Sequence, residues 1–471
     1  MQDSEDLYRQ SLDAASKKAL DFLSTLDRRS AGATADLPTL RRRLAKPLTK
    51  DGVPPEQVVL DLVRDVEGGL AGSAGGRFFG WVIGGSIPAA LAVDWLSSAW
   101  DQNAAIYATA PAAAVAEEVA GNWLKEILGL PTDASFAFVS GCQMAHTTCL
   151  AAARHALLAE QGWDVERRGL FGAPPIRIVT SDQRHGTVER AVRLLGMGLS
   201  QVHVIPSDPK GTLPASDLED ALRAGRTTPT IVLLQAGDVN AGAYDSFETL
   251  IPIAKKFGAW VHVDGAFGLW AAASPPYRHL VRGVADADSW ATDGHKWLNV
   301  PYDCGYAFVR DTGAHRASMS HHAPYLIQQA GARDQVDWNP EYSRRARGFP
   351  TYAALRQLGR DGVARLVERC CHHAQNLVTQ IGQLDGTEIV ASPIINQGLV
   401  RFLDPHPGAA PTDDDRRTDQ VIDAVDRTGE AFFGGTTWQG RRAMRVSVSS
   451  WRTTEEDVSR AAKAVAAALR S

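Results

Sequence analysis

The 471-residue sequence is poor in cysteine and carries little net charge of either sign. Its five cysteines include no CxxC pair, which argues against a zinc ribbon or a disulfide framework and indicates reduced thiols in a cytoplasmic protein. The 49 basic and 54 acidic residues give a net charge of −5, so no broad basic surface is expected. Nucleic acid and anionic membranes are therefore poor candidate partners.

Long apolar runs are missing as well. No stretch approaches the ~18 apolar residues of a membrane-spanning helix, and the best candidate, Ile87 to Trp100, is interrupted by Asp94 and two serines. The first ten residues are acidic and polar, unlike a secretory signal. We find no internal repeat and no low-complexity tract, and we predict a cytoplasmic protein without membrane partners.

The patterning of apolar residues predicts three regions. Residues 1–85 contain amphipathic helices at 6–28 and 54–67, which need another surface to bury their apolar sides. Residues 86–345 alternate short apolar runs with helix-length segments, a pattern typical of a mostly parallel, doubly wound α/β sheet. Residues 346–471 begin with a helical stretch to about residue 381 and continue as a smaller α+β domain.

The expected strands of the middle region are Phe136–Val139, Ile176–Thr180, Gln201–Ile205, Thr230–Leu234, Trp260–Asp264 and Gly305–Val309. In the last region we expect strands Gly398–Leu403 and Arg442–Ser449, a helix Glu455–Leu469, and an exposed loop at Asp413–Asp415.

The segment Thr292-Asp293-Gly294-His295-Lys296-Trp297 follows one probable strand and precedes another, so Lys296 could face a cleft. A lysine that forms an imine must be neutral for part of the time, and burial and cationic neighbours would favour that form. A solvated surface lysine is the ordinary alternative.

Asp264 ends a strand in Val261-His262-Val263-Asp264, where open α/β sheets bind ligands. Its carboxylate could pair with a protonated ring nitrogen. A helix cap, or a metal-binding pair with His262, are the alternatives.

Two further segments follow strands in the same way. His185, within 181–187, could stack on a planar ring or move a proton, or the segment could simply cap the next helix. Gly141, Cys142 and Gln143 form a turn before a helix, where backbone N–H groups bind phosphate.

Together these four segments resemble the group II pyridoxal-dependent decarboxylases, which include aromatic-L-amino-acid, histidine and glutamate decarboxylases. The resemblance runs from about Arg77 to the end, and the order and spacing of His185, Asp264 and Lys296 fit it. It implies a type I pyridoxal-phosphate transferase fold, like that of aspartate aminotransferase, and decarboxylation of an L-amino acid to its amine and CO₂. The matching stretches are 77–80, 101–118, 181–190, 262–266, 295–304, 343–347 and 445–447.

The resemblance also implies a role for each site residue. Lys296 would carry pyridoxal 5′-phosphate as a Schiff base, Asp264 would pair with the ring nitrogen, and His185 and Ala266 would lie against the two ring faces. The phosphate would lie at Gly141, Cys142 and Gln143, with Asp293 and His295 nearby.

Tyr325, in the polar segment 316–337, matches the family's proton donor and would favour the amine over an aldehyde product; an ordinary loop tyrosine is the alternative. His321 and His322 lie in the same segment without an evident third ligand, so no metal is expected.

The family's substrate pocket corresponds to Trp81, Val82 and Ile83 and, across a homodimer with shared active sites, to Ile106 and Tyr107. This apolar, aromatic lining favours an aromatic L-amino acid. Arg77 or Arg344 could instead hold an acidic substrate, or could form structural ion pairs. Other reactions of the same cofactor, such as aldehyde synthesis or aminotransfer, and a non-catalytic binding protein stay open.

Overall fold

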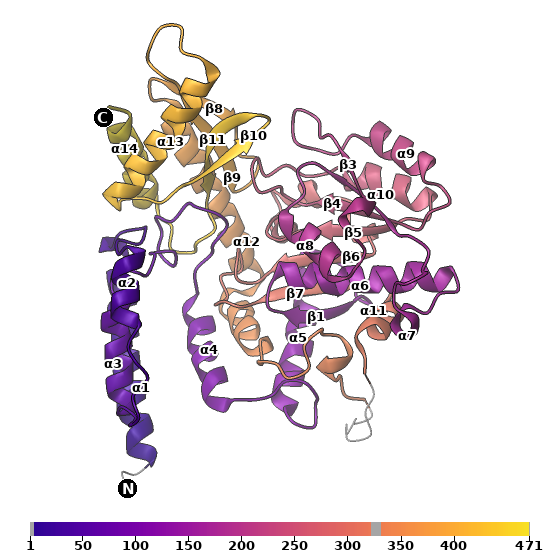
Figure 1. The fold of residues 1–471 in the computed structure, drawn as a ribbon, viewed down its shortest axis with the longest axis horizontal. Helices are drawn as coiled ribbons and strands as arrows, with labels where there is room; N and C mark the ends of the chain where they lie inside the picture. Colours follow the sequence, from indigo (N-terminus) through magenta and orange to yellow (C-terminus); the bar gives the residue numbers. More distant parts are fainter. Residues whose placement is uncertain (1–3, 322–330, 471) are drawn as a thin grey trace.

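The computed structural model describes residues 4–321 and 331–470, which form two sheets in separate parts of the molecule (Figure 1). The larger sheet has the strand order β1-β7-β6-β5-β4-β2-β3. Strand β7 is antiparallel to both neighbours, while the other pairs are parallel. The predicted mostly parallel sheet is therefore confirmed. Its strands are β1 Ser135–Val139, β2 Arg177–Ser181, β3 Val202–Ile205, β4 Thr230–Gln235, β5 Trp260–Asp264, β6 Ser289–Asp293 and β7 Gly305–Val309.

Helices cover both faces of this sheet, which is why its strands are almost continuously apolar. Successive side chains point to opposite faces, so Phe138 belongs to the apolar cluster that includes α5, α9 and α10, while Val139 belongs to the cluster that includes α6 and α8. The helices of this part are α4 Pro88–Trp100, α5 Pro111–Leu128, α6 Cys142–Glu160, α7 Val165–Arg168, α8 Gly186–Leu194, α9 Ala215–Ala224, α10 Phe247–Lys256 and α11 Thr312–Met319.

Helix α12, Gly348–Gly382, leads from the large sheet to a four-stranded antiparallel sheet of order β10-β11-β9-β8. These strands are β8 Thr387–Ala391, β9 Gln397–Phe402, β10 Gly434–Trp438 and β11 Arg441–Ser447. Helix α13 Pro411–Thr428 packs on β9 and β11, and α14 Glu455–Arg470 packs on α12 and α13. Two of these strands, β8 and β10, were not predicted, because their residues alternate little in polarity.

The prediction of a loop at Asp413–Asp415 is wrong, because these residues form the first turn of α13. Asp413 Oδ2 accepts a hydrogen bond from the Ala410 N–H at 2.9 Å and so caps the helix. Acidic side chains at a helix start also interact favourably with the helix dipole, so this run of charge marks a helix N-terminus.

The N-terminal helices α1 Ser4–Thr25 and α3 Pro55–Asp65 pack on each other and project from the body of the protein, with α2 Leu37–Leu44 nearby (Figure 1). They confirm the two predicted amphipathic helices. Within the described residues, no helix is long and apolar enough to cross a membrane.

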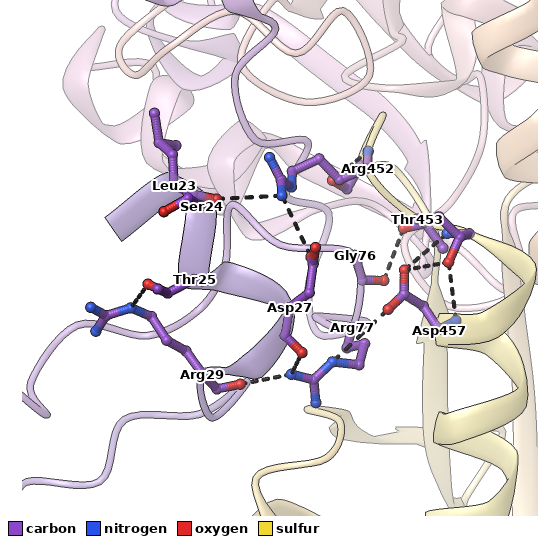
Figure 2. A network of polar contacts seen from close by, with 12 residues as sticks. Leu23, Ser24, Thr25, Asp27, Arg29, Gly76, Arg77, Arg452, Thr453 and Asp457 are labelled. Atoms are coloured by element: carbon purple, nitrogen blue, oxygen red, sulfur yellow. Dashed lines mark hydrogen bonds and ion pairs between the residues drawn. The ribbon is translucent and has the colours of Figure 1, made fainter. Parts of the chain in front are cut away.

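Arg77 joins this N-terminal segment to the C-terminal domain (Figure 2). Its guanidinium donates hydrogen bonds to the carbonyls of Asp27 at 3.1 Å, Arg29 at 2.7 Å and Gly429 at 3.2 Å. The Asp457 carboxylate lies 3.9 Å from Nε, and the side chain is buried. Of the two readings of Arg77, the structural one therefore holds.

Arg344 also makes structural contacts. Its guanidinium lies 2.8 Å from Glu117 Oε2 and donates to the carbonyls of Ala104 and Phe138, and all of these groups are buried. Both arginines that could have held an acidic substrate thus serve the fold.

Candidate functional site

A cavity opens at the carboxyl ends of β4, β5 and β6, where parallel strands present their last side chains to one edge. Gln235 ends β4, Asp264 ends β5, and Lys296 follows β6 by three residues. The cavity brings together four of the predicted residues, His185, Asp264, Ala266 and Lys296. Its full lining is Val82, His185, Gln235, Gly237, Asp238, Val239, Asp264, Ala266, Phe267 and Lys296.

Lys296 is held by an ion pair, with Nζ 3.0 Å from Asp293 Oδ2. Burial by itself would lower the pKa of Lys296, but the Asp293 and Asp264 carboxylates outweigh it, so the pKa is raised. Cationic neighbours would favour the neutral amine, whereas the strongest charged neighbours of Lys296 are anions. The shift favours the ammonium form of the free side chain.

The backbone beside Lys296 is crowded. A Cβ at Gly84 would lie 1.7 Å from the Lys296 carbonyl oxygen, so only glycine fits there. This contact places the segment around Val82 against the lysine.

Asp264 is buried, and its Oδ1 accepts a hydrogen bond from the Ala266 N–H at 3.1 Å. Its Oδ2 lies 3.5 Å from His146 Nε2. Burial alone would raise the pKa of Asp264. The opposite effect of His146, His185 and Lys296 is larger, so the net pKa lies well below its usual value. The carboxylate is therefore ionised at neutral pH and can pair with a cationic ring nitrogen.

The alternative of a His262–Asp264 metal pair does not hold, since both nitrogens of His262 are engaged by His146 and Ser289, each at 2.9 Å. The structure instead groups Cys142, His146 and Asp264, with possible ligand atoms within 4.8 Å of one another. Burial raises the pKa of the Cys142 thiol well above its usual value, so this sulfur is protonated.

His185 both caps α8 and lines the cavity. Its Nδ1 lies 2.7 Å from Thr187 Oγ1 and accepts the Thr187 N–H at 3.3 Å. Desolvation lowers the pKa of His185, so the ring is neutral and its proton is on Nε2. His185 therefore caps α8 through Nδ1, as the alternative predicted, and its ring also lines the cavity, where a ligand could contact it.

The predicted phosphate residues gather at the start of α6. The Cys142 N–H donates to Asp293 Oδ1 at 2.6 Å, so a carboxylate already occupies this helix N-terminus. His295 Nε2 lies 3.5 Å from the same oxygen, and its Nδ1 accepts the Cys304 N–H at 3.2 Å. The His295 ring stacks on Tyr302 with centroids 4.3 Å apart.

Glycines permit this arrangement. A Cβ at Gly305 would lie 2.5 Å from the Gly141 Cα, so the turn before α6 can rest directly on β7. Gln143 lies in the first turn of α6, directly after Cys142.

Of the predicted substrate residues, Val82 alone lines the cavity within one chain. Trp81 is 56% exposed and stacks on Phe432 with centroids 5.4 Å apart, while the neighbouring Val82 faces the cavity. Ile83, Ile106 and Tyr107 are half-buried outside it. Tyr325 and His322 lie outside the described residues.

The sequence suggested Gln235 as a compensating cofactor contact, whereas sequence reasoning missed a role for Arg445. Gln235 Nε2 donates to the Gln183 carbonyl at 2.9 Å, while its buried Oε1 has no partner in the described part of the chain. Arg445 on β11 is buried, and two of its nitrogens are likewise without a described partner. Burial lowers the pKa of Arg445 to about 10, against the effect of Asp238. An arginine inside an apolar strand is the sequence signal that could have revealed it.

These groups fit pyridoxal 5′-phosphate. Lys296 supplies a primary amine, Asp264 an ionised carboxylate, and Gln235 an unsatisfied oxygen, all on one cavity. His185 and Ala266 supply surfaces that could face a flat ring. The donor set thus suits a planar cofactor that has an aldehyde and a basic ring nitrogen.

Comparisons with known proteins agree with this geometry. The family model described as the pyridoxal-dependent decarboxylase conserved domain matches residues 39–403. The chain is 26% identical over 447 residues to an aromatic-L-amino-acid decarboxylase of Bacillus atrophaeus, covering 93% of this chain and 90% of that one. It is 25% identical over 462 residues to a 4-hydroxyphenylacetaldehyde synthase of Rhodiola rosea, covering 95% and 92%.

Among solved structures, that of Oryza sativa TDC with PLP and tryptamine superposes with a TM-score of 0.93 at 24% identity, covering 100% of this chain and 99% of that one. This likeness confirms the predicted type I fold.

Proposed function

Because the chain belongs to the pyridoxal-dependent decarboxylases, we propose that it converts an L-amino acid, preferably an aromatic one, to the amine and CO₂. The chain is accordingly a carboxy-lyase with pyridoxal 5′-phosphate as its cofactor. The observation that carries the proposal is the meeting of Lys296, Asp264 and His185 on one cavity at the strand ends.

Lys296 would bind the cofactor aldehyde through its amine, after losing a proton that Asp293 now holds in place. Asp264 would hold the ring nitrogen, since a buried ionised carboxylate needs a cationic partner. When bound, pyridoxal phosphate accepts the electron pair that is released as the carboxylate leaves Cα.

His185 would lie against one ring face and donate its Nε2–H to the substrate carboxylate. Holding that carboxylate perpendicular to the ring decides which bond at Cα breaks. Ala266 would support the opposite face, and Gly141, Cys142, Gln143 and His295 would surround the phosphate.

The preference for an aromatic substrate is supported by two features. Val82, Val239 and Phe267 give the cavity an apolar wall, and Arg77 and Arg344 are consumed by structural contacts. We propose that Trp81, Ile83, Ile106 and Tyr107 complete the pocket, the last two from a second copy of the chain in a homodimer.

Tyr325 is proposed to give the proton that Cα needs, which would direct the reaction to the amine. The similarity to an aldehyde synthase makes the oxidative outcome the competing function. We place the enzyme in the cytoplasm, since its five buried free thiols suit a reducing compartment.

The test is a panel of aromatic, acidic and aliphatic L-amino acids offered to the purified protein with added cofactor. We expect CO₂ and amine in equal amounts, highest with aromatic substrates, and a loss of at least about 10³-fold for Lys296→Ala. Aldehyde and ammonia in place of amine would establish the competing function. Absence of a cofactor absorbance in the wild-type protein would contradict both.

A further inference from the structure

A series of buried polar side chains, linked by hydrogen bonds, leads to Asp264 from behind the cavity. His146 on α6, His262 on β5 and Ser289 on β6 are each 0% exposed. His146 Nδ1 lies 2.9 Å from His262 Nε2, and His262 Nδ1 lies 2.9 Å from Ser289 Oγ. Polar groups buried between a sheet and a helix are costly unless each is satisfied, so their alignment on one carboxylate calls for a function.

The Asp264 carboxylate determines the direction of these hydrogen bonds. At one end, the Trp260 indole N–H can only donate, and it lies 2.9 Å from Ser289 Oγ. At the other end, an ionised carboxylate can only accept. An Nε2–H of His146 that faces this carboxylate at 3.5 Å leaves His146 Nδ1 to accept from His262 Nε2, and leaves His262 Nδ1 to accept from the Ser289 hydroxyl. Burial lowers the pKa of His262 to about 3, which agrees with one proton on its ring.

Cys142 also contacts the Asp264 end of this series. Its Sγ lies 3.4 Å from His146 Nε2 and 3.9 Å from Asp264 Oδ1, and its raised pKa keeps the thiol as a donor. The groups that face Asp264 are thus His146 and Cys142 from α6, the Ala266 N–H beyond β5, His185 before α8, and Lys296 after β6.

We propose that His146 is a positioning residue, which holds Asp264 ionised and directed at the cofactor's ring nitrogen. The proposal rests on the function proposed above. Through His262 and Ser289, the proton of His146 stays on Nε2, where it stabilises the anion that in turn keeps the ring nitrogen protonated. A protonated ring is the better electron acceptor, so a residue that does not contact the cofactor would set its reactivity.

The test compares two ligands of the full-length protein after its cofactor is removed. One is pyridoxal 5′-phosphate, and the other is the analogue in which carbon replaces the ring nitrogen. We expect His146→Leu to weaken binding of pyridoxal phosphate about tenfold, equivalent to ~1.4 kcal/mol, and to leave binding of the analogue unchanged. His146→Gln, which can return an N–H to the Nε2 position, should recover most of the loss. The shorter His146→Asn should not.

A second readout follows the ring nitrogen itself, by ¹⁵N NMR of labelled cofactor in the loaded enzyme. We expect this nitrogen to lose its proton at a lower pH in His146→Leu and His146→Asn than in the wild type. His155→Leu is the matched control, because His155 lies on the same helix α6 but contacts Glu166 at 3.4 Å, away from the cavity. This control should match the wild type in both measurements.

Equal weakening for both ligands, or an unchanged ring-nitrogen titration, would overturn the proposal and assign His146 to packing. If His146→Leu is too unstable to purify, His146→Gln and His146→Asn can be compared with each other. Only the asparagine variant should bind pyridoxal phosphate more weakly while binding the analogue normally. If the wild-type protein captures neither ligand, the proposed function itself fails, an outcome distinct from a failure of His146 alone.

Discussion

At the scale of single residues, Asp293 controls the state of the reactive amine. Its Oδ1 accepts the Cys142 N–H at 2.6 Å and its Oδ2 lies 3.0 Å from Lys296 Nζ. Since an ammonium cannot attack an aldehyde, the raised pKa of Lys296 opposes capture of the cofactor at neutral pH.

We therefore predict that Asp293→Asn speeds capture of pyridoxal phosphate by the cofactor-free protein. Loss of the charge lowers the pKa of Lys296, so more of the amine is neutral at a given pH, by up to about tenfold per pKa unit. The asparagine oxygen can still accept the Cys142 N–H. Stopped-flow absorbance against pH should show the midpoint of capture shifted to lower pH. If the capture rate rose equally at every pH and the midpoint did not move, the variant would instead have removed repulsion between the Asp293 carboxylate and the cofactor phosphate.

At the scale of elements, helix α12 bends where it leaves the large sheet. Gly359 lies inside it with φ 62° and ψ 179°, a conformation that is essentially restricted to glycine. A Cβ at this position would meet nothing within 4 Å, so a substitution there tests the backbone alone.

We expect Gly359→Ala to lower the free energy of unfolding by about 1–3 kcal/mol, because alanine is strained at this φ. Urea unfolding followed by tryptophan fluorescence measures the change. The control is Gly186→Ala in α8, also with open space around the new Cβ but without a positive φ. It should raise the free energy of unfolding by about 0.4–1 kcal/mol. Equal stability of Gly359→Ala and wild type would show that the bend is not needed.

At the scale of the whole molecule, the projecting helices α1 and α3 expose apolar side chains to solvent. Leu12 and Leu20 on α1 are 59% and 62% exposed, and Val58 and Leu62 on α3 are 51% and 54% exposed. Exposed apolar side chains on a projecting helix pair suit an interaction surface, and a second copy of the chain is the occupant we propose.

We predict that the double variant Leu12→Gln, Leu20→Gln weakens the dimer, because it makes this surface polar while keeping good helix formers. Sedimentation velocity should show a larger monomer fraction, and specific activity should fall on dilution if sites are shared. Phe171→Gln is the control, since Phe171 is 98% exposed but lies outside the helices. A wild-type protein that sediments as a monomer at all concentrations would contradict the prediction.

What the sequence determined by itself was local or followed from strand order. The apolar runs predicted β1 to β5 and β7 within a residue or two. His185, Asp264 and Lys296, which lie at or just after strand ends, meet at one cavity. This succeeded because the carboxyl ends of parallel strands share one edge of a sheet, so position along the chain nearly fixes position in space.

What only the tertiary structure decided were the partners of charged and polar side chains. The alignment of His146, His262 and Ser289, for example, depends on contacts between three separate elements. A residue's charge state is set by burial and by neighbours within a few ångströms. Those neighbours come from distant parts of the chain, and no local pattern names them.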